Sequence, residues 1–481
     1  MRPGTLLRLG LAGSRLDTVR VGLTALSTAL ATLAVLAAAN VVAIGPLTLH
    51  GVGSNEWAEQ YSNALLREPG LRPGVVLTLL LLTIPVFALA GQCARLGAPA
   101  RDRRLAAIRL AGATPAQTVA VAAAETGVAD LAGWLAGLAA LLAGRDLLGH
   151  PDAEGRLPLP TDVRPPAWLL VLAVVAVPAL AALAAAVAMR RVTVGPLGVV
   201  RRARRTTGPR PWPGLLVPAG MAAFAVGGAV PRLWVLLLAG AAATGLGIVL
   251  GTGWLTHVCG RVLQRRARRA STTLAAARLV SDPWSGSRTL AVLLICVLFG
   301  AGAAGVRAYL LAEVSLRQEA DPFYARTMDL IDAAILVAVA LTAIAMIVVV
   351  AEGVASRRRE YAALVATGVP RATLAGSILW QTLLPAVPAI LLAVLAGLGL
   401  SRTLGTRATV DTSGSYTCVS DTPQTQVCRP TTTPVRSVPV PIPWPELARD
   451  AAAGVGAVLV TTGAGLLLLR RSVDVEELRA A

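Results

Sequence analysis

Ten apolar stretches, each close to the length needed to cross a bilayer, constrain this chain more than any other feature. A spanning α-helix needs about 20 consecutive apolar residues. Hydrophobic residues make up 55% of the 481 residues and charged residues only 15%, whereas soluble domains are about 25% charged. The sequence therefore predicts an all-α integral membrane protein with about ten transmembrane helices. The stretches cover residues 21–45, 73–95, 118–143, 167–189, 213–230, 233–257, 289–311, 329–351, 375–400 and 450–469.

The fifth and sixth stretches are separated only by VPRL at residues 230–233. This segment could be a turn between two spans or a kink in one long helix. Arginine clusters at residues 201–205 and 265–269 flank the pair, and both clusters belong on the cytoplasmic side. An even number of crossings must then separate them, which favours the turn.

The positive charge orients the other spans. The formal net charge is +18 and no lysine occurs, so all the cationic side chains are arginines. They cluster before the first span and after the second, fourth and tenth spans. Because basic residues collect on the cytoplasmic side, both termini are predicted to lie on the cytoplasmic side of the plasma membrane. Membrane topology explains these arginines better than nucleic-acid binding does, and we expect no nucleic-acid partner. The first span could also be read as a signal peptide, but its apolar run of about 25 residues is long for one.

Two of the five cysteines lie in the last outside loop, residues 401–449. Cys418 and Cys428 have nine residues between them, and an outside location permits oxidation, so a disulfide here is a candidate. No histidine lies near enough to suggest a metal pair. Cys93, Cys259 and Cys296 lie in or at the ends of spans and are interpreted as small apolar filler.

A charged segment occurs twice. The first copy, RDRRLAAIRLAGATPAQ, covers residues 101–117, and the second copy, SRRREYAALVATGVPRAT, covers residues 356–373. Aligning Ala106 with Ala362, an offset of 256 residues, also aligns Gly112 with Gly368 without a gap. Each glycine is placed where a helix ends with a left-handed residue, and the proline that follows can open a new helix. Each copy is therefore predicted to be a short cytoplasmic helix, a sharp turn and the start of a span.

The similarity extends beyond these copies. LLRLGLAGSR at residues 6–15 and LAAARLVSDPWSGSR at residues 274–288 precede the first and seventh spans, and each is interpreted as an amphipathic helix on the inner surface. Four spans per half give both halves the same orientation. We therefore predict two parallel four-helix repeats, residues 1–205 and 261–481, joined by a transmembrane hairpin at residues 206–260.

At this point the sequence resembles a known family. RRREYAALVATGVPRATL is similar to the signature of FtsX-like permeases, the membrane subunits of MacB/FtsX-type ABC transporters, and the first copy resembles it again. The resemblance implies that both copies are coupling elements that dock on a cytoplasmic ABC ATPase, expected as two copies. Its implied coupling residues are Arg103, Arg104, Arg109, Gly112, Arg357, Arg358, Arg359, Glu360 and Gly368. The alternative is that these arginines only anchor span ends at the lipid headgroups.

The sequence offers no catalytic chemistry of its own. A P-loop needs the lysine of G-x-x-x-x-G-K-[ST], and the chain has no lysine. The three histidines are isolated and no Cys/His cluster has metal-ligand spacing. We expect no catalytic residue, no metal and no cofactor, so a separate ATPase must supply any energy from ATP.

Three polar residues are expected inside spans, where they are costly. Glu125 and its repeat partner Gln381 are expected at matching depth, and Asp130 lies deeper in the third span. Glu125 and Asp130 could hydrogen-bond across the bundle or contact substrate or protons. Asp329, Asp332 and Glu352 are interpreted as solvated span ends.

We therefore expect an ABC permease that couples ATP hydrolysis elsewhere to export, extraction or signalling at the outer face. One alternative is a proton-coupled secondary transporter that uses Glu125 and Asp130. The other is a non-transporting regulator of an envelope enzyme or a sensor kinase. Membrane lipid is an expected partner, and a sensor kinase or an envelope protein a further one.

Overall fold

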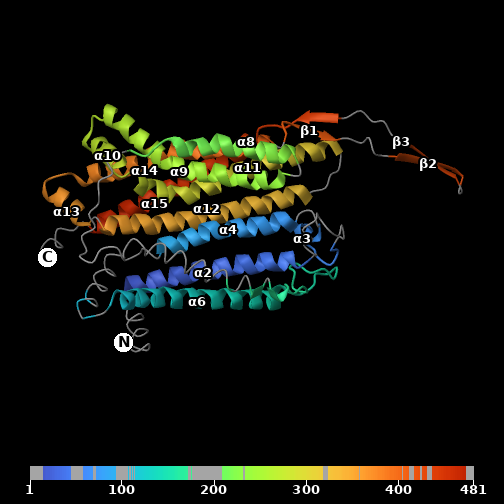
Figure 1. The fold of residues 1–481 in the computed structure, drawn as a ribbon, viewed down its shortest axis with the longest axis horizontal. Helices are drawn as coiled ribbons and strands as arrows, with labels where there is room; N and C mark the ends of the chain where they lie inside the picture. Colours follow the sequence, from blue (N-terminus) through green and yellow to red (C-terminus); the bar gives the residue numbers. More distant parts are fainter. Residues whose placement is uncertain are drawn as a thin grey trace.

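The computed structural model is a bundle of long helices that lie side by side (Figure 1). It describes residues 15–44, 58–68, 72–93, 107, 110, 112, 114–168, 170–171, 175, 208–230, 233–317, 323–356, 358–403, 405–410, 416–422, 425–430 and 436–472. Within these residues, eight helices are long and apolar enough to cross a membrane, and a ninth apolar helix is shorter. These nine correspond to nine of the ten predicted spans. Most of the fourth predicted span, 167–189, lies outside the described residues.

The first half of the chain is organised around α2 (Arg15–Val42). This helix packs against both α4 (Arg72–Cys93) and α6 (Pro115–Leu148). The helix α6 approaches α2 very closely at Gly133 and Gly137, where an added Cβ would meet the backbone of Ala25 and Ala29. Small residues at such positions let helices pack tightly in lipid, where van der Waals contact drives association.

The second half has the same pattern around α11 (Pro283–Arg317). This helix packs against α12 (Phe323–Ser356) and α14 (Arg371–Arg402), as α2 packs against α4 and α6. A further helix, α15 (Trp444–Ser472), packs against α11, α12 and α14. This shared pattern is what a repeat would produce, and the domain boundaries themselves stay a prediction. The short helix α13 (Arg358–Ala366) lies between α12 and α14.

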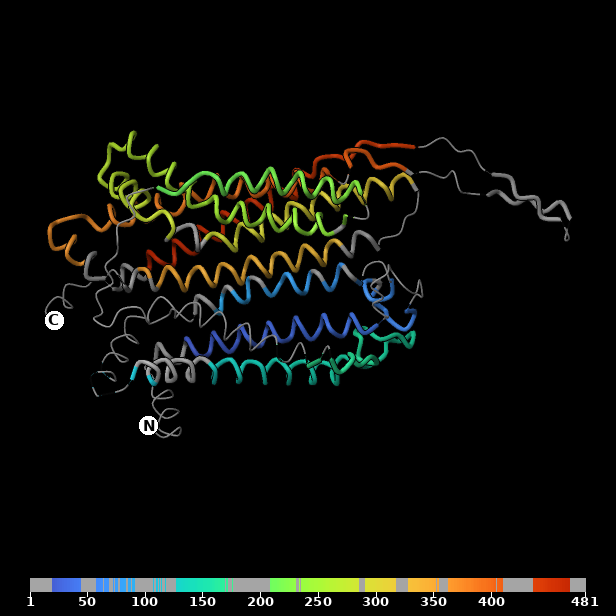
Figure 2. The backbone as a smooth tube through the Cα atoms, in the orientation of Figure 1, coloured from blue at the N-terminus to red at the C-terminus, as the bar shows by residue number. Residues whose placement is uncertain are grey.

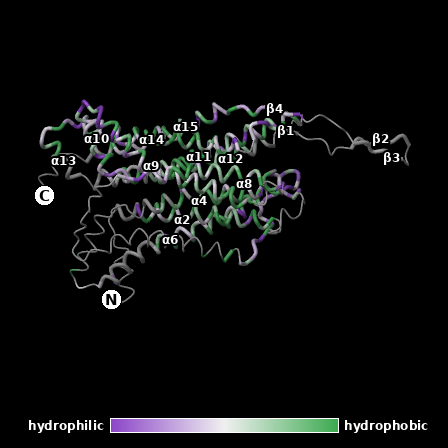
Figure 3. The backbone as a smooth tube through the Cα atoms, turned by 45° about the horizontal axis from the view of Figure 1, so that its top comes forward, coloured by the Kyte–Doolittle hydropathy of each residue, from purple (hydrophilic) through white to green (hydrophobic). Residues whose placement is uncertain are grey.

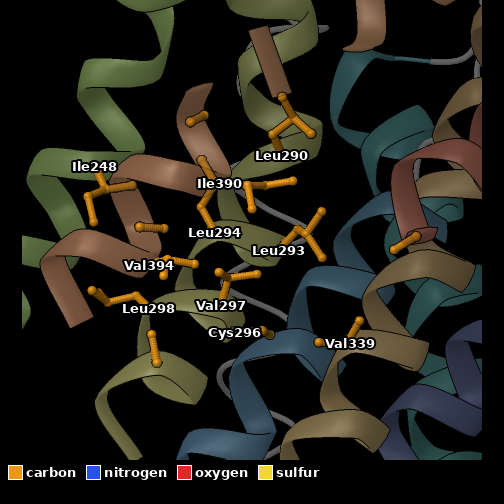
Figure 4. Close-up of a cluster of buried hydrophobic side chains, with 14 of the residues drawn as sticks. Ile248, Leu290, Leu293, Leu294, Cys296, Val297, Leu298, Val339, Ile390 and Val394 are labelled. Carbon is orange, nitrogen blue, oxygen red and sulfur yellow. The ribbon is translucent and has the colours of Figure 1, made fainter. Parts of the chain in front are cut away.

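The largest apolar core lies in this second half (Figure 4). Leu293 and Leu294 of α11 are fully buried and lie near Ile390 and Val394 of α14. Ile248 contributes to the same core from the neighbouring hairpin. The two halves meet where α4 packs on α12, with Leu89 of α4 against Ala345 and Val348 of α12. They are therefore joined through the second helix of each half.

Two helices, not one kinked helix, follow the first half. After the turn η1 (Trp212–Leu215), α8 (Leu216–Ala229) and α9 (Trp234–Arg266) form an antiparallel hairpin. Gly227 lies against Leu237 and Gly220 against Thr244, so the two helices run in opposite directions. The predicted turn at VPRL is therefore confirmed. The predicted domain boundary at residue 260 falls inside α9.

The segment before α11 differs from the prediction of a helix lying on the membrane surface. Here α10 (Ala270–Ser281) packs against α9 and α14. Its apolar side, Ala275, Ala276 and Leu279, is buried against protein, so this side does not face lipid. The rest of the predicted segment, from Pro283 to Arg288, is the start of α11.

The two ends of the bundle differ. We call the end that carries α13 the α13 end, and the end that carries the strands the ribbon end (Figure 1). Hydrophobic residues follow the length of the helices, and hydrophilic residues gather near their ends (Figure 3). Exposed tryptophans also mark the ends, with Trp212 at the α13 end and Trp168 and Trp444 at the ribbon end. Tryptophan prefers membrane–water interfaces, so these residues are placed as expected for a bilayer between the two ends.

The predicted outside loop forms a β-ribbon in two parts. At its base, β1 (Arg407–Val410) pairs antiparallel with β4 (Arg436–Pro439). At its tip, β2 (Tyr416–Thr422) pairs antiparallel with β3 (Thr425–Pro430). The ribbon extends away from the helices (Figure 2). A small β-structure is thus present at the ribbon end, among described residues that are otherwise mostly helical.

Candidate functional site

The second copy of the repeated segment forms a capped helix. Gly368 has φ +90°, a left-handed conformation that favours glycine. The amide of Val369 donates to the Leu364 carbonyl at 3.0 Å, and the Gly368 amide donates to the Val365 carbonyl at 3.0 Å. This pair of bonds is the Schellman ending of a helix. The structure therefore has the predicted short helix and sharp turn, and α14 begins three residues later at Arg371.

The same turn recurs in the first copy. Gly112 has φ +94°, and α6 begins at Pro115, its first residue. The Thr114 side chain accepts from the Gln117 amide at 3.3 Å, while the Gln117 side chain accepts from the Thr114 amide at 3.0 Å. This capping box satisfies two backbone donors at the helix start. Both glycines thus end one segment and allow the next helix to begin.

The two copies lie at the same end of the bundle. Both α6 and α14 begin at the α13 end and run towards the ribbon end (Figure 1). Leu110 of the first copy is 90% exposed, and Ala107 is exposed as well. In the second copy, Ala363 and Ala366 are exposed. Each copy therefore presents small or apolar side chains to its surroundings at this end.

The second copy is attached firmly to three helices. Leu364, Val365 and Val369 pack around Leu374 and Ile378 of α14. The same cluster includes one residue of α12 and one of α15, Val350 and Leu466. Close-packed side chains transmit strain. A force applied to α13 would therefore reach α12, α14 and α15 directly.

Several residues predicted for this site cannot be placed in it. Arg103, Arg104, Arg109 and Arg357 lie outside the described residues. The backbones of Arg358, Arg359 and Glu360 belong to α13. Around them, the α13 end carries exposed arginines, which are Arg261, Arg265, Arg266, Arg268, Arg269 and Arg371. The coupling role of the predicted residues stays a prediction.

The ribbon end carries acidic as well as basic residues. Its loops and helix ends contain Glu59, Asp152, Glu154, Asp162, Asp329 and Glu446. An excess of arginine at one end and mixed charge at the other is the asymmetry expected across a membrane. It favours a cytoplasmic α13 end.

Two of the predicted intramembrane polar residues can be described. Asp130 is 7% exposed, and its Oδ1 lies 2.9 Å from the Thr28 hydroxyl of α2. This contact ties α6 to α2 through a hydrogen bond inside the bundle. The Nε2 of Gln381 in α14 is buried and has no hydrogen-bond partner. Glu125 lies in α6, and its pairing in depth with Gln381 stays a prediction.

An ion-pair network at the ribbon end was missed by the sequence interpretation. Asp332 of α12 accepts from Arg307 of α11 at 3.1 Å and from Arg449 of α15 at 2.8 Å. Its side chain is only 11% exposed, so it is not a solvated helix end. Arg307 also pairs with Asp329 at 3.0 Å, and Arg449 lies 3.6 Å from Asp450. The network joins three helices at the end opposite to α13.

The first half has a different arrangement at the ribbon end. The Tyr61 hydroxyl donates to Oδ1 of Asp162 at 2.6 Å. Tyr61 is completely buried in a cluster formed by two loops together with Val41 of α2 and Val75 of α4. Burial, and then the bond to the Asp162 carboxylate, raise the pKa of Tyr61 above its ordinary value. The loops at residues 58–68 and 150–163 are thereby fastened to each other.

Among the described residues, no group of three or more His, Cys, Asp or Glu residues is arranged to hold a metal ion. The acidic residues of the network at the ribbon end are instead paired with arginines. The predicted disulfide pair, Cys418 and Cys428, consists of opposite residues of β2 and β3.

Comparison with known families gives one match. Residues 333–473 match the family described as FtsX-like permease C-terminal. The matched range begins within α12 and includes α13, α14, the ribbon and all of α15. Neither the curated proteins nor the solved structures that were compared with the chain gave a match.

Proposed function

We propose that the chain is the permease of an ABC transporter and couples ATP hydrolysis by a separate cytoplasmic ATPase to movement at the ribbon end, because residues 333–473 match the FtsX-like permease C-terminal family. The observation that carries the proposal is the position of α13. This short capped helix lies inside the matched range, at one end of the bundle, and packs against three long helices.

The two copies would be the contacts for the ATPase. Both end in a left-handed glycine followed by a long helix, and both lie at the α13 end. Two similar contacts suit a partner with two copies. Docking of the exposed Leu110 in an apolar pocket would remove this side chain from water, which is favourable. The arginines of both copies would pair with acidic groups around such pockets.

The orientation of the chain follows the positive-inside rule. The α13 end and both termini would lie on the cytoplasmic side of the plasma membrane. The ribbon end would face outward. A short capped helix joined to spans on both sides would then be pushed when the ATPase subunits close, and the push would pass into α12, α14 and α15.

The energy source distinguishes this proposal from a proton-coupled transporter. The chain has no lysine, so it cannot supply the lysine of a P-loop, and ATP hydrolysis would come from a separate subunit. Asp130 bonds to Thr28 at the α2–α6 contact, which gives this carboxylic acid a role in packing.

The test is recovery of ATPase activity with the tagged full-length chain from its native membranes. We expect the purified material to hydrolyse ATP. The Arg358→Glu/Arg359→Glu variant should lose most of this activity because the charge on α13 is reversed. The matched control is Arg265→Glu/Arg266→Glu, which reverses exposed arginines at the same end, on α9, and should retain it.

Two results would count against the proposal. The first is that the natural chain yields no ATP hydrolysis while its transport is abolished by a protonophore and by Asp130→Asn. Alternatively, the α13 variant and the α9 control could lose the same share of activity. Membrane levels of each variant must be equal for either comparison.

A further inference from the structure

The base of the ribbon packs against a long helix, and its tip lies farther out. At the base, Ala408 of β1 and Val440 after β4 are buried against Ala308 and Ala312 of α11. The tip strands β2 and β3 pair with each other and extend beyond the helices (Figure 1). An isolated two-stranded hairpin is marginally stable at best in water. The tip therefore needs a further constraint to keep its shape.

The strand register supplies a place for such a constraint. Cys418 of β2 is directly opposite Cys428 of β3, between the pairs Thr417–Arg429 and Val419–Val427. Opposite residues of antiparallel strands have Cα atoms about 4.5–5.5 Å apart. Disulfides join cysteines whose Cα atoms are about 4.4–6.8 Å apart. Opposite residues of paired strands also belong to the same face of the ribbon, so the register is compatible with a bond between these two positions.

We propose that Cys418 and Cys428 form a cross-strand disulfide that closes the tip of the ribbon and holds it in its paired form. The proposal rests on the outward orientation of the ribbon end given under the proposed function, because disulfides persist in oxidising compartments. A shift of the register by one residue would place the two cysteines on opposite faces. The bond would therefore also fix the register.

The oxidation needs a disulfide donor of the outer compartment, such as an oxidised dithiol protein. The thiolate of one cysteine attacks the donor disulfide and forms a mixed disulfide. The thiolate of the second cysteine then attacks the sulfur of the first. Two electrons pass to the donor, which leaves as a dithiol with the two protons that the cysteines lost.

The bond can be tested in the full-length chain in its membrane. Free thiols are blocked with N-ethylmaleimide in denaturing detergent, and disulfides are then reduced and labelled with a polyethylene-glycol maleimide. We expect a gel shift of two labels for the natural chain. The variants Cys418→Ser and Cys428→Ser should both lose the whole shift, because each leaves a single thiol that is blocked at the first step.

Two of the three remaining cysteines serve as internal controls. Cys296 is buried and Cys259 is a free thiol, so neither should contribute to the shift. A natural chain without any shift would overturn the proposal. A shift that persists in either serine variant would also overturn it, because the bond would then involve another cysteine.

A second measurement separates the bond from the orientation. In Cys428→Ser the thiol of Cys418 should react on intact cells with a maleimide that cannot cross membranes, relative to the Cys418→Ser/Cys428→Ser background. Reaction together with no disulfide in the natural chain would defeat only the disulfide. If Cys418 reacts only after the membrane is opened, the outward orientation fails, and with it the topology of the proposed function.

Discussion

Substitution of Gly137 by alanine tests the contact between α6 and α2. A Cβ at this position would lie 2.6 Å from the Ala29 carbonyl oxygen and 2.9 Å from Cβ of Thr32. Because the nearest atom belongs to the backbone, a change of rotamer cannot relieve the contact, and the two helices must move apart. Overpacking of this kind costs about 1–3 kcal/mol.

The opposing effect of the substitution is helix propensity. Alanine is better than glycine in a helix interior by up to about 1 kcal/mol. The matched control is Gly144→Ala in the same helix, where an added Cβ meets nothing within 4 Å. The control keeps the propensity gain without the overpacking. We therefore expect the free energy of unfolding of Gly137→Ala to be about 1–3 kcal/mol below that of Gly144→Ala.

The measurement is unfolding of the purified chain in mixed micelles with increasing sodium dodecyl sulfate, followed by far-ultraviolet circular dichroism. Ala29→Gly should not rescue Gly137→Ala, because the carbonyl oxygen remains. Equal midpoints for the Gly137 and Gly144 variants would refute the close approach of the two helices. Rescue by Ala29→Gly would refute the backbone origin of the clash.

Three further predictions concern the ends of the bundle. Asp332→Ala should lower the free energy of unfolding by about 2–3 kcal/mol. This is somewhat less than for a fully buried ion pair, because the Arg449 side chain is 43% exposed. In the same assay Asp329→Ala should lower it by under about 1 kcal/mol, because the Asp329 side chain is 65% exposed. Since the pKa of Tyr61 is raised above 10.0, its contribution to stability is present below pH 10 and lost as the pH rises further; protease cleavage of the loop at residues 58–68 should increase there, and Tyr61→Phe should remove this dependence. Gly368→Ala places a side chain at φ +90°, which costs about 1–2 kcal/mol, and should reduce the co-purified ATPase activity, whereas Gly463→Ala, in open space, should not.

The elements that could be predicted are those set by local sequence. A bilayer-length apolar run needs no distant partner to form a helix, because its backbone bonds are all internal. The turns at Gly112 and Gly368 were predictable for the same reason. A glycine followed by proline ends one helix and begins another whatever surrounds it. The arginine clusters favoured the hairpin at VPRL, because two clusters on the same side of the membrane must be separated by an even number of crossings.

The features that were missed depend on pairs of residues far apart in the chain. Asp332 was interpreted as solvated because it lies near the start of a span. Its two arginines, at positions 307 and 449, lie on other helices. The α10 segment was interpreted as lying on lipid because an amphipathic pattern shows an apolar face and not what covers it. In the structure α9 and α14 cover that face.

The sequence indicated where the two repeated segments lie, but not how the second one packs against its neighbours. The two copies were identified from their repetition, and the structure has both at one end of the bundle. The packing of Val369 with Leu374 and Ile378 was not predictable, because it depends on how the chain turns between α13 and α14. The opposite placement of Cys418 and Cys428 was likewise unknown, because the spacing of two cysteines does not define a strand register.

The unbroken length of α12 has a mechanical consequence. This helix of 34 residues is about 51 Å long at a rise of about 1.5 Å per residue. One end adjoins α13, and near the other end Asp332 forms ion pairs with Arg307 of α11 and Arg449 of α15. A stiff rod of this length turns a tilt of about 5° at one end into a sideways travel of about 4 Å at the other. Because only residues 440–443 separate β4 from α15, this displacement would also move the base of the ribbon. A small push at the α13 end would then become a larger displacement of the strands at the ribbon end.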